Sequence, residues 1–317
     1  MQTDKSWNVL NKSQIKNGKN LIKVLLKNRE IKTVKEKKEF LYPKLKKVTV
    51  KSVGIDSKNL KKAISRIKLA IENKEQIVVF GDYDVDGICG SAILWEILNS
   101  LGAKVMPYIP HRIDEGYGLS SKGISNVKLQ ISNVKLIITV DNGIVANKAV
   151  YFANEQGIDV IITDHHVPSK SLPKAFSIVH TTKLCGAGVA YLLAQELKIN
   201  PSTNSGEKLK IGEDKHLELV ALATVADLVP LKGANRTLLK FGLKELSETK
   251  RVGLLELLKE AALKKESLGV YEIGHMIAPR LNAMGRLEYA MDSLRLICTT
   301  NQKRAGELAR LLGSTNQ

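Results

Sequence analysis

Three short segments of the sequence are rich in side chains that bind divalent metal ions. They contain three alternating carboxylates, a single carboxylate, and a carboxylate followed by two histidines: Asp82, Asp84, Asp86, Asp141, Asp164, His165 and His166. A mainly carboxylate ligand set with one imidazole favours Mn²⁺ or Mg²⁺ over zinc. Two such ions, ~3.5 to 4 Å apart, commonly hydrolyse phosphodiesters. The residue types therefore predict a two-ion site, with Asp141 positioned to bridge the ions.

Each of these segments directly follows a short apolar run, at residues 76–80, 136–140 and 158–162. Runs rich in β-branched residues that stop at Gly or Asp are typical of buried parallel strands. Ligands of open α/β sheets bind where the carboxyl ends of the strands converge. A lone Asp is usually a turn or capping residue, but seven residues at three successive strand ends favour a common site.

Two other classes of site fit the first segment poorly. In a calcium-binding EF-hand that starts at Asp82, the required Glu at position twelve would be Ile93, and the loop would follow a helix rather than a strand. A phosphatase of the haloacid dehalogenase type needs a Thr after its paired aspartates, which residues 84–88 lack. Gly81 and Gly87 would allow the loop the extended form that a two-ion site needs.

Alternating strand and helix patterns continue through the middle of the chain. Strands are predicted at 76–80, 104–109, 136–140 and 158–162, with helices at 58–73, 88–101, 121–127 and 145–156. This order predicts an α/β fold: a parallel sheet with helices on both faces. The hexapeptide at 124–129 is repeated at 131–136, which we interpret as a local duplication in a surface helix and its connection.

The two ends of the chain carry mainly helical patterns. After Pro173, helices are predicted at 188–197, 215–226, 236–246, 252–263 and 302–317, and short helices are predicted at 12–27 and 33–41. We therefore expect a basic helical arm at 1–51, an α/β core at 52–235 and a helical extension at 236–317.

Positive charge is concentrated at the N-terminus. The chain carries a formal net charge of +17, and residues 1–51 hold 15 Lys or Arg against 4 Asp or Glu, which is 15 − 4 = +11. A basic arm beside a metal site suits a nucleic-acid backbone. The alternative is a lysine-rich solvated surface, which explains any single Lys equally well.

The sequence predicts a cytoplasmic protein that does not contact a membrane. Apolar stretches stay short of the ~18 residues of a membrane span, and the first residues lack a secretory pattern. The three cysteines are widely spaced and form no CxxC pair, so neither a disulfide framework nor a structural zinc site is expected.

Several further residues are weaker candidates for the site. Asp227 follows an apolar helix and by itself is more typical of a helix end. Arg112, Arg280 and Arg286 lie in polar segments that could meet a phosphate, although most arginines are surface charges. The glycines of residues 186–190 could offer backbone N–H groups to an anion or serve only close packing.

Taken together, these motifs resemble the RecJ-type single-stranded-DNA exonucleases of the DHH phosphoesterase superfamily. Residues 82–87, 141–143 and 164–166 are similar to its first motifs, and the Asp-His-His sequence at 164–166 names the superfamily. Further similar segments are 25–31, 40–43, 186–191, 227–231, 279–283 and 285–286. The resemblance extends nearly from end to end, and the combination of motifs is specific.

The resemblance implies a role for each candidate residue. One ion would be held by Asp82, Asp84 and Asp141, and the other by Asp86, Asp141, His165 and Asp227. His166 would contact the scissile phosphate, and Asp164 would orient its neighbours. Arg112 would bind a phosphate near the 5′ end. Arg280 and Arg286 lie in segments similar to a further signature of the family, and they remain candidate phosphate ligands.

Two departures from the family pattern stand out. The segment 178–186 is shorter than the loop that precedes the corresponding motif in the family. The chain also stops about where the family's connecting helix begins, before its small substrate-binding domain and its oligonucleotide-binding domain. We therefore expect a truncated gene product or a fragment.

The expected activity is metal-dependent hydrolysis of single-stranded DNA, in repair and recombination. The 5′-to-3′ direction is implied by the resemblance alone. Two alternatives stay open. One is a single-stranded nucleic-acid-binding protein that has lost catalysis, since the missing domain would form the other wall of the cleft. The other is a DHH phosphodiesterase for short oligonucleotides or cyclic dinucleotides.

Overall fold

The structure, a computed structural model, describes residues 17–199, 216–287 and 289–316. Its contacts divide the chain into two units, Met1–Lys44 and Leu45–Gln317. The first unit contains α1 (Gly18–Asn28) and α2 (Val34–Leu41), which match the helices expected there; residues 12–16 of that prediction lie outside the described residues. The second unit holds both the α/β region and the helices that follow it, so the division at 235 remains a prediction.

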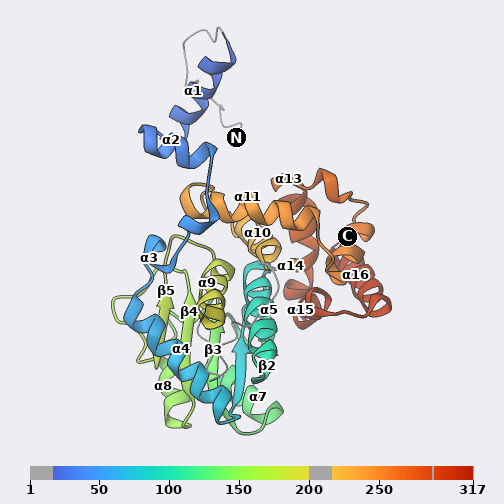
Figure 1. The fold of residues 1–317 in the computed structure, drawn as a ribbon. Coiled ribbons are helices and arrows are strands. Elements are labelled where there is room, and N and C mark those ends of the chain that lie inside the picture. The colour runs from blue at the N-terminus through green and yellow to red at the C-terminus, as the bar shows by residue number, and fades with distance from the viewer. Residues whose placement is uncertain (1–16, 200–215, 288, 317) are drawn as a thin grey trace, which may run out of the picture. The chain divides into compact units, whose positions relative to one another are not determined.

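A five-stranded, entirely parallel sheet forms the basis of the α/β part of the second unit (Figure 1). Its order is β2 (Lys104–Tyr108), β1 (Gln76–Phe80), β3 (Val134–Val140), β4 (Asp159–Asp164) and β5 (Ser177–His180). The predicted fold class and four predicted strands are confirmed. The edge strand β5 was not predicted, because its four residues carry no long apolar run.

Both faces of the sheet are buried. In β1, Ile77 and Val79 join one apolar cluster while Val78 and Phe80 join another, as expected when successive side chains point to opposite faces. The first cluster includes side chains of α4 (Ser57–Glu72), α5 (Val85–Ser100) and α9 (Gly186–Ile199). The second includes α7 (Ser121–Gln130) and α8 (Asn147–Glu155). Helices therefore cover both faces, as the strand and helix pattern predicted.

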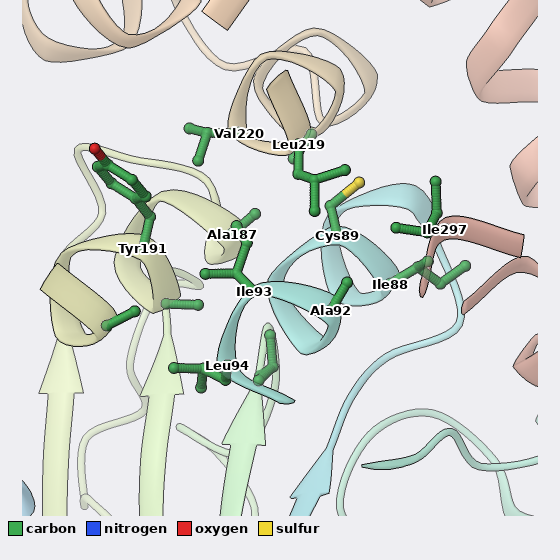
Figure 2. Close-up of a cluster of buried hydrophobic side chains, with 14 of the residues drawn as sticks. Ile88, Cys89, Ala92, Ile93, Leu94, Ala187, Tyr191, Leu219, Val220 and Ile297 are labelled. Atoms are coloured by element: carbon green, nitrogen blue, oxygen red, sulfur yellow. The ribbon is translucent and has the colours of Figure 1, made fainter. Parts of the chain in front are cut away.

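Helix α5 runs through the larger cluster. Asp84 is its N-cap, and Ile88, Cys89 and Ile93 are fully buried. Figure 2 shows these side chains packed among residues of α9, of α10 (Leu217–Ala226) and of α15 (Met291–Cys298). A helix that is apolar on all sides is expected in a core. The start of α5 is consequently held rigidly, and this start forms part of the carboxylate-rich segment.

The remaining helices of the second unit pack on α5, α10 and α15 and on one another. They are α11 (Gly233–Ser247), α12 (Val252–Glu260), α13 (Val270–Glu272), the π-helical η3 (Ile273–Ile277), α14 (Ala278–Leu287) and α16 (Gln302–Asn316). Shorter elements are η1 (Leu45–Lys47), α3 (Val50–Val53), α6 (Arg112–Glu115) and η2 (Lys265–Ser267). The helices α9, α10, α11, α12 and α16 agree with prediction to within a few residues, whereas α14 and α15 were not predicted.

The three cysteines are free thiols, and Cys89 and Cys185 are buried. Within the described ranges, the helices are too short or too polar to cross a membrane.

Candidate metal centre

The predicted ligands meet at the carboxyl ends of three neighbouring strands. Residues 82–86 follow β1 and Asp141 follows β3, while β4 ends at Asp164 and is followed by His165 and His166. Because β1, β3 and β4 are adjacent and parallel, their ends bring these loops to one edge of the sheet. Asp227, at the C-cap of α10, joins them from the helical part of the unit.

Three groups of side chains are close enough to hold metal ions. They are Asp82, Asp84 and Asp141; Asp86, His165 and Asp227; and Asp141, His165 and His166. Within each group, one ligand atom from every residue lies within 4.8 Å of the others. The groups are linked because Asp141 and His165 each belong to two of them.

His165 lies between the carboxylates of the other groups. Its Nε2 is 3.1 Å from Asp141 Oδ1, 3.6 Å from Asp86 Oδ2 and 3.6 Å from Asp227 Oδ2. These atoms approach one another without the geometry of a hydrogen bond. Among the described residues, buried atoms without a hydrogen-bond partner include Asp82 Oδ1, Asp141 Oδ1, His165 Nε2 and Asp227 Oδ2.

Buried polar atoms in native proteins are nearly always paired. Asp141 Oδ1 and Asp227 Oδ2 both approach His165 Nε2, and Asp82 shares a group with Asp141. Bound cations would satisfy these unpaired atoms. Five carboxylates and one or two imidazoles also form a donor set suited to Mn²⁺ or Mg²⁺. The residues present therefore fit a pair of divalent ions.

The carboxylate of Asp86 is hydrogen-bonded to the start of α9. Its two oxygens accept the backbone N–H groups of Gly186 (2.6 Å) and Ala187 (2.7 Å). The predicted anion-binding N–H groups of residues 186–190 therefore bind a carboxylate of the protein itself. Gly186 is required for this approach, because a Cβ there would lie 2.6 Å from Asp141 Cβ.

Asp141 has a left-handed backbone, with φ of 63°. Non-glycine residues seldom adopt this conformation, and it often occurs at functional sites. The following Asn142 stabilises the turn: its Nδ2 donates to the carbonyls of Phe80 (3.3 Å) and Val140 (2.8 Å), and its Oδ1 accepts the Leu119 N–H (3.1 Å). One amide side chain thus connects the ends of β1 and β3.

Asp164 is surrounded by donors rather than directed at an ion. Its carboxylate accepts the N–H groups of Ile144 (2.9 Å), His165 (2.7 Å) and His166 (3.1 Å), and His166 Nδ1 lies 2.8 Å away. The orienting role that the resemblance implies would use these contacts. They direct His166 Nε2 toward Tyr117, whose hydroxyl is 3.3 Å away.

Crowding of carboxylates in a buried region alters their pKa values. Burial, followed by the charge of Asp84, raises the pKa of Asp82 to about 7. Burial, with the charges of Asp84 and Asp227, raises the pKa of Asp86 to about 8. The pKa of Asp141 is raised well above its usual value for the same reasons, burial first. These shifts indicate a centre whose ionised form needs positive charge.

The pKa values of the two imidazoles and of the remaining carboxylates shift in different directions. Burial lowers the pKa of His165, which favours the neutral form that binds metals. The hydrogen bond to Asp164 raises the pKa of His166. Burial and the charge of Asp84 raise the pKa of Asp227 to about 6. For Asp164 burial is outweighed by hydrogen bonds from His166 and Ile144, which lower its pKa.

The three predicted phosphate-binding arginines have different surroundings. Arg112 lies over the ring of Tyr83, with Cζ 5.1 Å from the centroid, next to the first ligand segment. Arg280 instead donates from Nε to Glu260 (2.6 Å) and from Nη1 to the Met276 carbonyl (2.8 Å). These contacts give Arg280 a structural role, and phosphate binding by Arg280 stays a prediction. The side chain of Arg286 lies outside the described residues.

Two residues of the site had no role assigned from the sequence. Tyr117 lies within a segment that was singled out, and its hydroxyl reaches both His166 and the Asp141 carbonyl (3.4 Å). His180 Nε2 lies 2.7 Å from the His166 carbonyl. The local sequence could not predict these contacts, because the residues that each contact joins are far apart in the sequence.

The fold and this geometry define an α/β protein with a carboxylate-rich metal-binding centre at the ends of its parallel strands. Residues 76–224 match the model of the DHH family, N-terminal domain. These residues therefore form a DHH-family domain, as the motifs indicated.

The chain is also similar to RecJ proteins. It is 38% identical over 273 residues to the single-stranded-DNA-specific exonuclease RecJ of Bacillus subtilis strain 168, covering 83% of this chain and 33% of the relative. It is 38% identical over 266 residues to the RecJ of Thermus thermophilus, covering 80% and 38%. The chain therefore spans about a third of the length of these curated relatives.

Two solved structures share the fold. A crystal structure of exonuclease RecJ bound to manganese has a TM-score of 0.70 and 35% identity, covering 81% of this chain and 65% of that one. A crystal structure of RecJ from Thermus thermophilus in complex with Mn²⁺ has a TM-score of 0.72 and 32% identity, covering 92% and 41%.

Proposed function

We propose that this chain carries the metal-dependent catalytic centre of a 5′-to-3′ exonuclease for single-stranded DNA, acting in DNA repair and recombination. The observation that supports it most is the pair of linked ligand groups, Asp82, Asp84 and Asp141 beside Asp86, His165 and Asp227. The matched relatives are described as single-stranded-DNA-specific exonucleases. A DNA substrate is in keeping with the cytoplasmic location expected from the sequence.

The proposed ligand assignment follows these groups. Asp82, Asp84 and Asp141 would hold one ion, and Asp86, Asp141, His165 and Asp227 the other, with Mn²⁺ or Mg²⁺ as the metal. When bound, such a pair supplies Lewis acidity and lowers the pKa of a coordinated water toward neutrality. The buried carboxylates and the neutral His165 are the protein's contribution to holding it.

His166 is the residue proposed to contact the scissile phosphate. Asp164 fixes its ring through Nδ1 at 2.8 Å, which leaves Nε2 on the side of Tyr117. The raised pKa of His166 favours the imidazolium. In that form Nε2–H can donate to a phosphate oxygen and stabilise negative charge that develops during hydrolysis.

Arg112 is proposed as a ligand of the phosphate at the 5′ end. It lies over Tyr83, the residue between Asp82 and Asp84, so its guanidinium adjoins the metal centre. Arg is well suited to bidentate contact with phosphate oxygens. A surface cleft beside Asp227, lined by Val225, Leu228, Pro279 and Asn282 among others, is the proposed place for a nucleotide next to the metal centre.

The experiment that tests the proposal compares wild-type protein with an Asp141→Asn variant. The substrate is 5′-phosphorylated single-stranded DNA with Mn²⁺. Asn tolerates the left-handed backbone at this position, so the change removes charge with little strain. We expect hydrolysis to fall by at least about 100-fold, since a bridging carboxylate serves both ions.

Asp56→Ala is the matched control. Asp56 caps α4 through the Asn59 N–H and is not among the candidate ligands, so this variant should lose some stability but keep its activity. Equal activity in wild type and Asp141→Asn would reject the proposed role. Faster hydrolysis of dinucleotides or cyclic dinucleotides than of long strands would favour a DHH phosphodiesterase for short substrates. Salt-sensitive strand binding without product would favour a binding protein.

A further inference from the structure

The segment that carries Asp84 and Asp86 is contacted by a helix far away in the sequence. The Oδ1 atom of Asn282, in α14, accepts the backbone N–H of Val85 at 2.9 Å. Val85 separates Asp84, which belongs to one candidate ion group, from Asp86, which belongs to the other. This one hydrogen bond therefore acts on the peptide that links the two groups.

The N–H of Val85 needs a partner from outside its own helix. Val85 is the first residue of α5 and is fully buried, and the first N–H groups of a helix have no partner within it. The N-cap Asp84 already accepts the Gly87 N–H through Oδ1 (3.0 Å). Asn282 thus caps a second N–H group at the start of α5, and Asp84 Oδ2 is left available for an ion.

Close packing holds α14 in this place. A Cβ on Gly285 would lie 2.4 Å from the Tyr83 carbonyl oxygen, so only glycine lets the helix come this near. Asn282 and Gly285 are three residues apart and share one face of α14. They therefore contact the residues on either side of Asp84.

Other contacts anchor α14 to its neighbours. Arg280 pairs with Glu260 of α12 at 2.6 Å, and the Ser293 hydroxyl of α15 donates to the Leu281 carbonyl at 2.8 Å. These contacts hold α14, and with it Asn282, in a fixed position.

We propose that Asn282 is a positioning residue of the metal centre. By accepting the Val85 N–H, it sets the peptide between Asp84 and Asp86 and so the spacing of the two ion groups. Without this acceptor, the loop would have to turn a buried donor toward another partner, and the acceptors on the same loop are the carboxylates themselves. This inference rests on the proposed function, because it concerns the same two ions.

The test is the affinity for Mn²⁺, measured by the loss of the free-ion signal in electron paramagnetic resonance during titration at constant pH. Asn282→Ala should weaken Mn²⁺ binding by about 10-fold or more, which is the usual effect of removing a residue that orients metal ligands. The control Asn301→Ala removes the same kind of bond, from the Arg304 N–H at 2.9 Å at the start of α16. It should leave Mn²⁺ affinity unchanged.

A double-variant cycle separates this bond from general packing. Val85→Pro deletes the donor, and Pro is favourable at the first position of a helix. Asp84 already has φ of −90° and ψ of 177°, a conformation allowed before Pro. In the Val85→Pro protein, Asn282→Ala should change Mn²⁺ affinity by less than about 3-fold, because the two changes remove one interaction.

Each outcome decides the question. Wild-type affinity in a folded Asn282→Ala protein, or an equal loss in the Val85→Pro background, would overturn the inference. If Asn282→Ala fails to fold alone but folds with Val85→Pro, the bond is supported; failure in both would overturn it by assigning Asn282 to packing. A wild-type protein that binds no Mn²⁺ would reject the proposed function itself.

Discussion

Asp82, Asp86 and Asp141 combine burial with crowding of like charges. Burial and neighbouring charges raise the pKa of Asp82 to about 7 and that of Asp86 to about 8. These carboxyls resist ionisation in the absence of a cation. The same side chains that would bind two ions therefore destabilise the metal-free fold near neutral pH.

This conflict predicts how the metal-free protein responds to pH. In the unfolded chain these carboxyls ionise near pKa 3.8, whereas in the folded protein they keep their protons to about 7 or 8. The folded state thus binds more protons in this interval, and the free energy of unfolding falls as pH rises. We expect the metal-free Tm to fall between about pH 5 and about pH 8 and Mn²⁺ to restore it at the higher pH.

Asp82→Asn is the variant that checks this explanation by thermal denaturation. It should raise metal-free stability at about pH 8 by on the order of 2 kcal/mol and reduce the stabilisation by Mn²⁺. A metal-free Tm that rises steadily over this pH range in the wild type would contradict the explanation.

At the scale of elements, the start of α9 connects the core to the site. Its first two N–H groups bind Asp86, and Gly186 lies against Asp141. A side chain at Gly186 would have to displace either the helix or the carboxylate of Asp141, because its Cβ would lie 2.7 Å from Asp141 Oδ1. The approach of α9 thus sets the positions of two proposed ligands, Asp86 and Asp141, together.

Gly186→Ala should therefore lower stability by about 1–3 kcal/mol, the usual cost of overpacking, and weaken Mn²⁺ binding. Urea denaturation and Mn²⁺ titration measure the two effects. Gly306→Ala in α16 is the matched control, since its Cβ would meet Glu256 Oε2 at 3.5 Å, an ordinary contact. That change should be neutral or stabilising by about 0.5–1 kcal/mol. A Gly186→Ala protein equal to wild type in both measurements would refute the argument.

For the second unit taken whole, an ionic network beside the large core joins several helices. Arg251, at the N-cap of α12, donates to Glu96 of α5, to Glu218 of α10 (2.9 Å) and to the Ile297 carbonyl of α15 (3.0 Å). His216 lies 2.9 Å from Glu96. Although burial opposes it, hydrogen bonds from His216 and Arg251 lower the pKa of Glu96 to about 2.

The lowered pKa of Glu96 predicts that the stability of the fold decreases in acid, and a variant of Glu96 can test this. A carboxyl with a folded pKa of about 2 and an unfolded pKa of 4.5 contributes stability above 4.5 and loses it as pH falls toward 2. Glu96→Gln should cost about 3 kcal/mol at neutral pH, and this deficit should shrink as the pH is lowered from about 7 toward about 3. Urea denaturation at several pH values measures it, and a deficit independent of pH would exclude the mechanism.

The sequence by itself determined four of the five strands and the candidate ligands at the ends of three of them. The apolar runs at 76–80, 136–140 and 158–162 are local signals for strands. Adjacent parallel strands bring their carboxyl ends to one edge of the sheet. The grouping of Asp82, Asp141 and His165 therefore followed from the order of the elements. The alternation of buried residues in β1 between two clusters agrees with the same local period.

Tertiary structure alone decided what depends on distant partners. The same hexapeptide is helical at residues 124–129 in α7, whereas residues 131–136 form a turn and enter β3, because the sheet, and not the local sequence, offers the second copy a strand partner. Likewise, Asn282 accepts a hydrogen bond from Val85, and Arg280 donates one to Glu260. Local spacing carries no information on such pairs, since packing between whole helices chooses them.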